Sequence, residues 1–416
     1  MATKPKLALI PSAYKASKLY SVLPADGVGD FDFSRPTTAT RVNEDGLIET
    51  VGSNIPRLNY PMIDGVVSGC PSLLLEPART NLITHSEDFS DSSWDKVNVS
   101  VSSNNSISPN GTLNGDLIQA TSNVGLIVIT NFLTETQQII SVFAKSGNYD
   151  KFKMGQASNE YYAEFDLTSG TVLNVNANLS EASIDYYGNG WYRCSVTYAS
   201  PLGLKTLGIV IEGNGNSVNF FGAQSEFGSY ATSYIPTNGS SVTRDAETCT
   251  GAGDSATFND SEGVLMAEIS SLDDEAVYKL LSINNNTVEN QITIGISNTL
   301  NNLYVDSKIG NSTVISNEGF PAIQQNFNKV LVKYKSGSNS IYLNGFKIDS
   351  NSNTFTPTGN QLVELEFSYY TSTLNFYGNV KQLQYFDTAL TDEELEYITS
   401  YRSFNEMAQA QLYKIQ

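Results

Sequence analysis

A single histidine limits the nucleophilic chemistry that this chain could perform. His85 stands in the stretch LITHSEDF, directly before Ser86, Glu87 and Asp88. A Ser-His-Asp triad needs side chains that converge from separate parts of a fold, which adjacent residues rarely do. The chain also has no G-x-S-x-G sequence, the pattern that places a nucleophilic serine on a sharp turn. We therefore predict that His85 lies on the surface at a strand end and has no catalytic role.

Two acids on one strand could support glycoside hydrolysis, which uses a pair of carboxylates across a cleft. Glu164 and Asp166 flank Phe165, so the alternation of a strand would place both on one face. The pattern of concanavalin A-like glycosidases, which this pair resembles, has a further Glu shortly afterwards. This chain reads Leu-Thr-Ser-Gly over 167–170 instead. We interpret the two acids as solvated carboxylates of an acidic protein and predict no catalytic residues.

Aromatic side chains next to polar ones could bind sugars. Sugar rings stack on Trp and Tyr, while Asn, Asp and Gln bind the hydroxyls. Our glycan-binding candidates are Trp94, Trp191, Tyr186, Tyr187, Tyr369 and Tyr370. Packing in the core is the alternative for each, because one face of the strand WYRCSVTY (191–198) must be buried. Tyr369 and Tyr370 precede Thr371 and Ser372 at an apparent strand end, which favours the surface for this pair.

Residue types that bind transition metals are sparse. With one His and three widely separated cysteines, Cys70, Cys194 and Cys249, the sequence argues against a zinc site and a disulfide framework. Reduced, mostly buried thiols are the expected state. No acidic loop of the D-x-D-x-D-G kind points to calcium. We predict no metal ligands and no cofactor.

The charge balance argues against a nucleic-acid surface. The chain has 43 Asp and Glu against 24 Lys and Arg, a formal net charge of −19, whereas phosphate binding needs clustered cations. We interpret this charge as a source of solubility. The N-terminal stretch MATKPKLALIPSAYK has only a short apolar run, and no later run reaches the length of a membrane span. We predict neither a signal peptide nor membrane insertion.

Short β-strands separated by turns would position these residues. The chain is 40% hydrophobic and contains 23 Tyr and 19 Phe, a composition that suits sandwiches with polar outer faces. Turn signals recur every ten or so residues over 76–240, which predicts a jelly roll, and the pattern restarts over 241–390 as a second antiparallel sandwich. The junction between them is the stretch 220–247, rich in Gly, Ser and Asn. The predicted fold class is all-β.

The two ends of the chain differ from the sandwiches. Residues 1–75 carry strand-like pieces, including a hairpin over 38–51, but too few apolar residues for a core of their own. They are either an anchoring and oligomerisation arm or an extended arm packed on the next domain. Residues 391–416 form the last part, a C-terminal helix and tail in which Thr391 and Glu394 predict a capping box.

Long phrases resemble a group of bacteriophage virion proteins over nearly the whole chain. Those of the arm and the junction are FDFSRPTTATRVNEDGLIETVGSNIPRLNY (31–60), SLLLEPARTNLITHSEDFS (72–90), GAQSEFGSYATSYIPT (222–237) and VTRDAE (242–247). Together with GNGWYRCSVT (188–197), the junction phrases are similar to carbohydrate-binding-module-like jelly rolls. The last part resembles concanavalin A-like or laminin-G-like sandwiches, through KVLVKYKSGSNSIYLNG (329–345) and NFYGNVKQLQYFDTALTDEELEYITS (375–400).

This resemblance implies a non-enzymatic fibre or decoration protein on the surface of a virion. It would be made in the bacterial host cytoplasm, form a homotrimer, and contact other virion proteins at head, neck or tail through its N-terminal arm. Its sandwiches would bind host-surface glycans. Jelly rolls of this kind sometimes hold a structural calcium ion, for which Glu87, Asp88 and Asp116 could supply oxygens. The alternatives are a structural cement or spacer protein without glycan binding and, more distantly, a polysaccharide-degrading enzyme.

Overall fold

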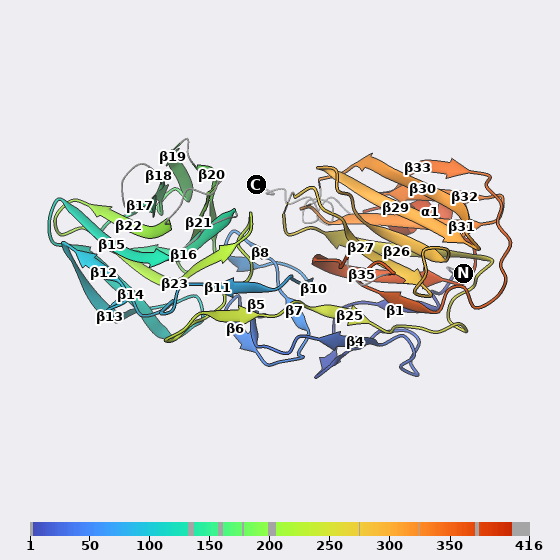
Figure 1. Ribbon diagram of the computed structural model, residues 1–416, viewed down its shortest axis with the longest axis horizontal. Helices are drawn as coiled ribbons and strands as arrows, with labels where there is room; N and C mark the ends of the chain where they lie inside the picture. The colour runs from blue at the N-terminus through green and yellow to red at the C-terminus, as the bar shows by residue number, and fades with distance from the viewer. Residues whose placement is uncertain are drawn as a thin grey trace.

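The computed structural model describes residues 3–131, 137–156, 161–176, 179–198, 205–273, 275–323, 325–370 and 374–401. These residues form almost only antiparallel β-structure, which confirms the predicted all-β class. Two β-sandwiches lie side by side along the long axis of the molecule, and strands from the N-terminal region lie between and below them (Figure 1).

The first sandwich consists of two six-stranded sheets that face each other across an apolar core. One sheet has the order β13(Val99–Ile107), β14(Leu113–Ala120), β23(Ser217–Phe227), β16(Gln138–Ser146), β21(Trp191–Tyr198) and β20(Leu179–Tyr186). The other has the order β12(Asp95–Val97), β15(Val124–Asn131), β22(Lys205–Glu212), β17(Lys151–Gln156), β18(Tyr161–Asp166) and β19(Thr171–Val175). Alternate side chains, such as Cys194 and Val196 of β21, point into the core between the sheets.

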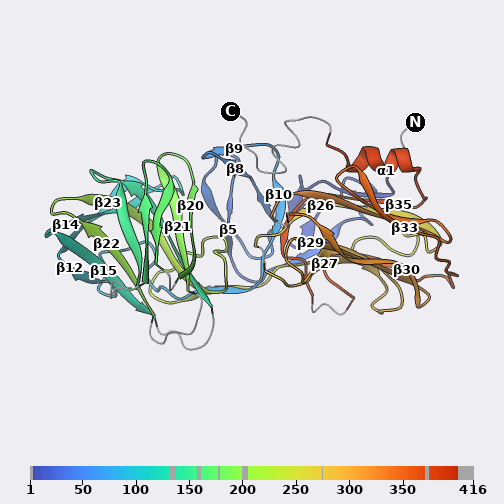
Figure 2. The same ribbon diagram turned by 90° about the horizontal axis from the view of Figure 1, so that it is seen from above.

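The second sandwich has an eight-stranded and a five-stranded sheet. The larger has the order β33(Phe346–Asn351), β32(Asn339–Leu343), β31(Asn328–Lys335), β26(Glu262–Ser270), β35(Gly378–Phe386), β10(Ser72–Leu75) and β7(Arg57–Asn59), with β1(Leu7–Leu9) also paired to β35. The smaller has the order β30(Ser312–Pro321), β29(Asn302–Ile309), β28(Gln291–Ile296), β27(Lys279–Asn284) and β34(Glu364–Glu366). Figure 2 shows the two sandwiches from above.

Strands from residues 1–75 complete the second sandwich although they come first in the chain. Leu7 pairs with Tyr385, and Leu73 pairs with Val380, so two N-terminal strands pair with β35. The remaining N-terminal strands form three small sheets. One has the order β2(Tyr14–Lys15), β3(Lys18–Leu19), β4(Phe31–Ser34) and β25(Thr248–Thr250). The other two are the hairpins β5(Ala39–Val42)–β6(Ile48–Val51) and β8(Met62–Ile63)–β9(Val66–Val67). A final pair joins β11(Arg79–Asn81) to β24(Val242–Arg244). This region therefore obtains its core from the C-terminal sandwich.

Local sequence signals form the expected turns and cap. The predicted hairpin over 38–51 is β5–β6, and Asn344–Gly345 joins β32 to β33, both residues with positive φ. Helix α1(Asp392–Thr399) begins after Thr391, whose hydroxyl accepts the backbone N–H of Glu394. The side chain of Glu394 accepts the backbone N–H of Thr391 in return, which confirms the predicted capping box. Residues 402–416 of the predicted helix and tail lie outside the described part of the chain.

Candidate functional site

Both tryptophan candidates are buried, which corrects their assignment as sugar-binding residues. Trp94 and Trp191 are each 1% exposed. The indole N–H of Trp94 donates to the carbonyl of His85 at 3.0 Å, and that of Trp191 donates to the carbonyl of Ile107 at 2.8 Å. Neither ring has a free face on which a sugar could stack. Both side chains are therefore packed in the interior, which was the alternative to sugar binding.

The neighbouring tyrosines at the end of β20 diverge to opposite faces of their sheet. Tyr187 packs edge-on against Phe143, with ring centroids 5.0 Å apart, on the face away from the sandwich core. Tyr186 is 37% exposed and packs against Tyr192 with ring centroids 4.8 Å apart. The two residues therefore belong to different surfaces.

The third tyrosine pair lies on the second sandwich. The rings of Tyr369 and Tyr370 are 4.4 Å apart in an edge-to-face arrangement, and both residues are half-buried. The hydroxyl of Tyr369 accepts the Nε2–H of Gln291 at 2.9 Å. Thr371 and Ser372, their predicted polar neighbours, lie outside the described residues.

The residues around His85 are not arranged as a catalytic triad. The Nδ1 atom of His85 lies 3.4 Å from Asp91 Oδ1 and 3.3 Å from Ser93 Oγ, so acid and hydroxyl share one ring nitrogen. A triad places them at opposite nitrogens of the imidazole. Ser86 is fully buried, and its hydroxyl bonds to the hydroxyl of Tyr234 at 2.7 Å.

Three of the candidate acids for hydrolysis or calcium binding accept hydrogen bonds from within the fold. Asp166 Oδ1 accepts the backbone N–H groups of Thr168 and Ser169, and the bond from Ser169 is the main cause of its lowered pKa. Asp116 accepts two backbone N–H groups, and Glu87 accepts the hydroxyl of Tyr234 at 3.0 Å. Among the described residues, no group of three His, Cys, Asp or Glu could hold a metal ion.

The exposure of the three cysteines differs. Cys194 and Cys249 are buried, and Cys70 is exposed; all three are unpaired thiols. Burial raises the pKa of both buried thiols well above the ordinary value.

No helix within the described ranges is long and apolar enough to cross a membrane.

A polar cleft of about 470 Å³ opens between the two sandwiches. We call it the inter-sandwich cleft, and its lining is Gln137, Ile139, Glu181, Ser183, Asp185, Tyr187, Arg193, Ser195, Thr197, Ser229, Tyr230, Ala231, Leu272, Asp273 and Gln325. Its floor is the outer face of β16, β21 and β20. Strand alternation explains the polarity of this floor, because Arg193, Ser195 and Thr197 alternate with the core residues Cys194 and Val196.

Arg193 is the only cation in this lining. The residue is 7% exposed, and its guanidinium donates to Ser141 Oγ at 3.0 Å and lies 5.4 Å from the centre of the Phe143 ring. These contacts hold the side chain flat on the floor. The hydroxyls of Ser183 and Ser195 bond to each other at 2.7 Å across the neighbouring strands.

The second sandwich supplies one wall of the cleft. Asp273 is 3% exposed, and its Oδ1 accepts the ammonium group of Lys279 at 2.6 Å and the backbone N–H of Glu275 at 2.7 Å. Burial raises the pKa of Asp273, and the bond from Lys279 opposes that rise. The other oxygen, Oδ2, is buried and has no hydrogen-bond partner in the described part of the chain.

Residues 229–231 form a further wall, which is tied to both sandwiches. The Thr197 hydroxyl donates to the carbonyl of Ser229 at 3.1 Å, and the Ser229 hydroxyl donates to Glu275. Tyr230 stacks on the guanidinium of Arg79, whose carbon lies 5.7 Å from the ring centre. Immediately afterwards, Thr232 donates its backbone N–H and its hydroxyl to the buried Glu226 at 2.9 and 2.6 Å.

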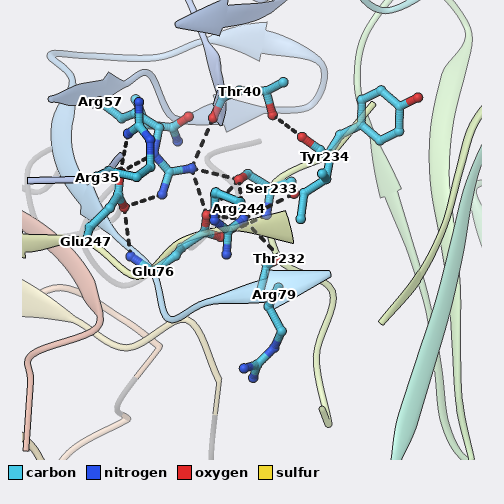
Figure 3. Close-up of polar contacts among 12 residues, drawn as sticks. Arg35, Thr40, Arg57, Glu76, Arg79, Thr232, Ser233, Tyr234, Arg244 and Glu247 are labelled. Atoms are coloured by element: carbon cyan, nitrogen blue, oxygen red, sulfur yellow. Dashed lines mark hydrogen bonds and ion pairs between the residues drawn. The ribbon is translucent and has the colours of Figure 1, made fainter. Parts of the chain in front are cut away.

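A buried charge network anchors this wall to the N-terminal region (Figure 3). Glu76 accepts the backbone N–H and the hydroxyl of Ser233 at 2.8 and 2.6 Å. It also forms ion pairs with Arg57 at 2.7 Å and Arg244 at 2.9 Å. Burial alone would raise the pKa of Glu76, but the two arginines and the bonds from Ser233 hold it well below its usual range.

Glu247 is the second acid of the network. It pairs with Arg35 at 2.6 Å and bridges to Arg57, and its Oε2 accepts the backbone N–H of Glu76 at 2.9 Å. All five charged side chains, Arg35, Arg57, Glu76, Arg244 and Glu247, are at most 2% exposed. They come from residues 31–60, 72–90 and 242–247, so these segments meet in one buried joint, which we call the arginine–glutamate joint.

Sequence reasoning missed Arg193, Tyr230 and Asp273 as parts of one site. The alternation in WYRCSVTY does place Arg193 with Trp191, opposite Cys194, but it does not say which face is core. Tyr230 and Asp273 are separated from it by long stretches of sequence and meet it only because the two sandwiches face each other.

No family model matches the chain, and no curated protein matches it. Among solved structures, the CBM40 of the Ruminococcus gnavus IT-sialidase matches with a TM-score of 0.30 and 18% identity, over 36% of this chain and 88% of that one. Domain 4 of AbnA, a GH43 extracellular arabinanase from Geobacillus stearothermophilus solved with arabinotriose, matches with a TM-score of 0.30 and 12% identity, over 41% of this chain and 83% of that one. A leech intramolecular trans-sialidase matches with a TM-score of 0.28 and 18% identity, over 37% of this chain and 25% of that one. TM-scores this low support no conclusion about the ligand of this chain.

Proposed function

We propose that this protein binds glycans without hydrolysing them, and that the ligand occupies the inter-sandwich cleft. The observation that carries this proposal is one concave surface that presents hydroxyls, carboxylates, a guanidinium and the two rings Tyr187 and Tyr230. Mixed donors and acceptors suit sugar hydroxyls, and tyrosine rings suit the apolar faces of sugars. A cleft of 470 Å³ falls within the range of about 300–1,000 Å³ that is typical of small-molecule sites.

The setting that we propose is the surface of a bacteriophage particle. The support comes from the phrases of residues 31–60 and 72–90 and from the junction phrases, which resemble virion proteins. Residues 1–75 would contact other virion proteins, with exposed apolar side chains such as Ile10, Val22 and Val66 available for that contact. As a homotrimer in several copies, the protein would combine weak sugar contacts through effective concentration.

A structural spacer that binds no sugar is the second candidate. The arginine–glutamate joint favours it, because this joint fixes the N-terminal region and the wall between the sandwiches as one unit. Such a fixed unit would suit a protein that holds neighbouring virion components at a set distance.

The test is a glycan array probed with the wild-type protein, followed by an assay for new reducing ends on every glycan that binds. We expect binding to bacterial surface glycans without release of reducing sugar. A blank array, together with unchanged adsorption of particles to cells, would favour the spacer. Release of reducing ends would contradict the non-enzymatic proposal.

A further inference from the structure

A second hollow adjoins the inter-sandwich cleft beyond the end of β20. Its volume is about 480 Å³, and we call it the Tyr186 hollow, with the lining Met62, Ile63, Asp64, Ser169, Gly170, Ile184, Asp185, Tyr186 and Tyr192. Asp185 lines both this hollow and the inter-sandwich cleft. The two spaces lie on opposite faces of the sheet and share Asp185 at its edge strand, β20.

A pair of tyrosine rings forms the aromatic surface of this hollow. Tyr186 and Tyr192 lie with ring centroids 4.8 Å apart, tilted by 38°. The hydroxyl of Tyr186 accepts the backbone N–H of Gly190 at 3.2 Å, which fixes the outer end of the ring. A rigid and partly exposed aromatic ring beside polar groups is the arrangement on which sugar rings stack.

The hairpin β8–β9 closes one side of the hollow. A Cβ atom built on Gly65 would lie 2.4 Å from Cε1 of Tyr186, and one built on Gly188 would lie 2.6 Å from the carbonyl oxygen of Gly65. Both glycines have positive φ. The hairpin tip thus packs directly against the tyrosine ring, which places Met62, Ile63 and Asp64 of the N-terminal region at the edge of the hollow.

The charges of the lining select for an uncharged ligand. Asp64 and Asp185 line the hollow, and none of the described residues that line it is Lys or Arg. An acidic sugar would face these two carboxylates, whereas the hydroxyls of a neutral sugar can donate to carboxylate oxygens.

We propose that the Tyr186 hollow is a second sugar subsite, and that the ligand is a neutral oligosaccharide that passes from the inter-sandwich cleft over Asp185 around the edge of the sheet. This inference rests on the proposed glycan binding in the cleft and adds the length and the charge of the oligosaccharide that is bound. It also gives the N-terminal hairpin a role in recognition.

The test compares wild-type protein with Tyr186→Ala, Tyr186→Phe and the control Tyr397→Ala, which removes an exposed tyrosine of α1. The probes are neutral oligosaccharides from disaccharide to hexasaccharide, cut from the neutral polysaccharide with the strongest array signal. We expect the affinity of the wild type to rise with chain length. Tyr186→Ala should bind the longest probe with about tenfold lower affinity, since one stacking contact is removed. Its affinity for the disaccharide should be unchanged. Tyr186→Phe should keep the length dependence.

Three results would overturn this inference, and they are distinguishable. A blank glycan array for the wild-type protein would remove the proposed function and the inference together, whereas binding of charged glycans alone would remove only the inference. Binding that does not depend on chain length and is unchanged in Tyr186→Ala would remove the subsite alone and leave glycan binding in the cleft intact.

Discussion

Replacing Glu247 by Ala should lower the free energy of unfolding by about 3–5 kcal/mol, because the change leaves the buried Arg35 without its counter-charge and leaves Arg57 with Glu76 alone. Arg35 and Arg57 are fully buried and both pair with this carboxylate. The remaining donors of Arg35 already bond to backbone carbonyls, such as that of Thr37, whereas Arg57 keeps its contacts with Glu76 and the carbonyl of Thr40. Chemical denaturation of the wild type and the variant measures the loss.

The control for this prediction is Glu49→Ala. Glu49 pairs with Arg41 at 3.3 Å, but its side chain is 42% exposed. The free energy of unfolding should therefore fall by only about 0–1 kcal/mol. Equal midpoints of denaturation for both variants would mean that the arginine–glutamate joint does not hold the N-terminal region and the sandwiches together. Proteolysis of native Glu247→Ala within residues 229–247 would show directly whether the wall of the cleft has come loose.

Replacing Trp191 by Ala should cost about 3–5 kcal/mol of stability, because it removes a buried indole from a packed cluster. The ring is 1% exposed and packs with Phe143, Phe221 and Tyr234 on the outer face of β21. The change also leaves the carbonyl of Ile107 without the indole donor. Thermal and chemical unfolding measure this loss.

The matched comparison is Tyr397→Ala, which removes an aromatic residue that is 60% exposed and should change stability little. A Trp191→Ala protein with wild-type stability and specifically weakened sugar binding would contradict the structural role given to this indole. It would restore Trp191 as a ligand contact.

Sequence patterns predicted the local structure well because turns and caps depend on neighbouring residues. Asn344–Gly345 specifies its hairpin through backbone conformations that these two residues adopt easily. Thr391 and Glu394 specify the start of the helix by hydrogen bonds over one turn. Alternation likewise predicted strands such as β21, because one set of side chains must enter the core.

The candidate site could not be predicted in the same way, because both faces of its sheet are largely covered. Trp191 packs on one face and Cys194 on the other, so alternation alone could not assign an outer surface. The pairing of β1 and β10 with β35 also joins residues separated by more than 300 positions, which no local pattern reports.

The phrases that resemble virion proteins have a structural explanation in this chain. Arg35, Arg57, Glu76, Arg244 and Glu247 all lie within them, and these residues form the arginine–glutamate joint. A buried ion-pair network demands particular residues at particular positions, because any unpaired member is costly. Residues within these phrases therefore hold the sandwiches in place. In our proposal, the residues that line the inter-sandwich cleft determine what is bound.

The most direct test of glycan binding in the inter-sandwich cleft is a calorimetric titration of Ser183→Trp with the glycan that gives the strongest array signal. Ser183 lies on the floor of the cleft in an edge strand, so an indole at this position should fill the space without removing a charge. The control is Ser350→Trp, the same change at an exposed position of the edge strand β33. We predict that Ser183→Trp abolishes measurable binding while Ser350→Trp binds like the wild type. Undiminished binding by a folded Ser183→Trp protein would contradict the account and place the ligand elsewhere.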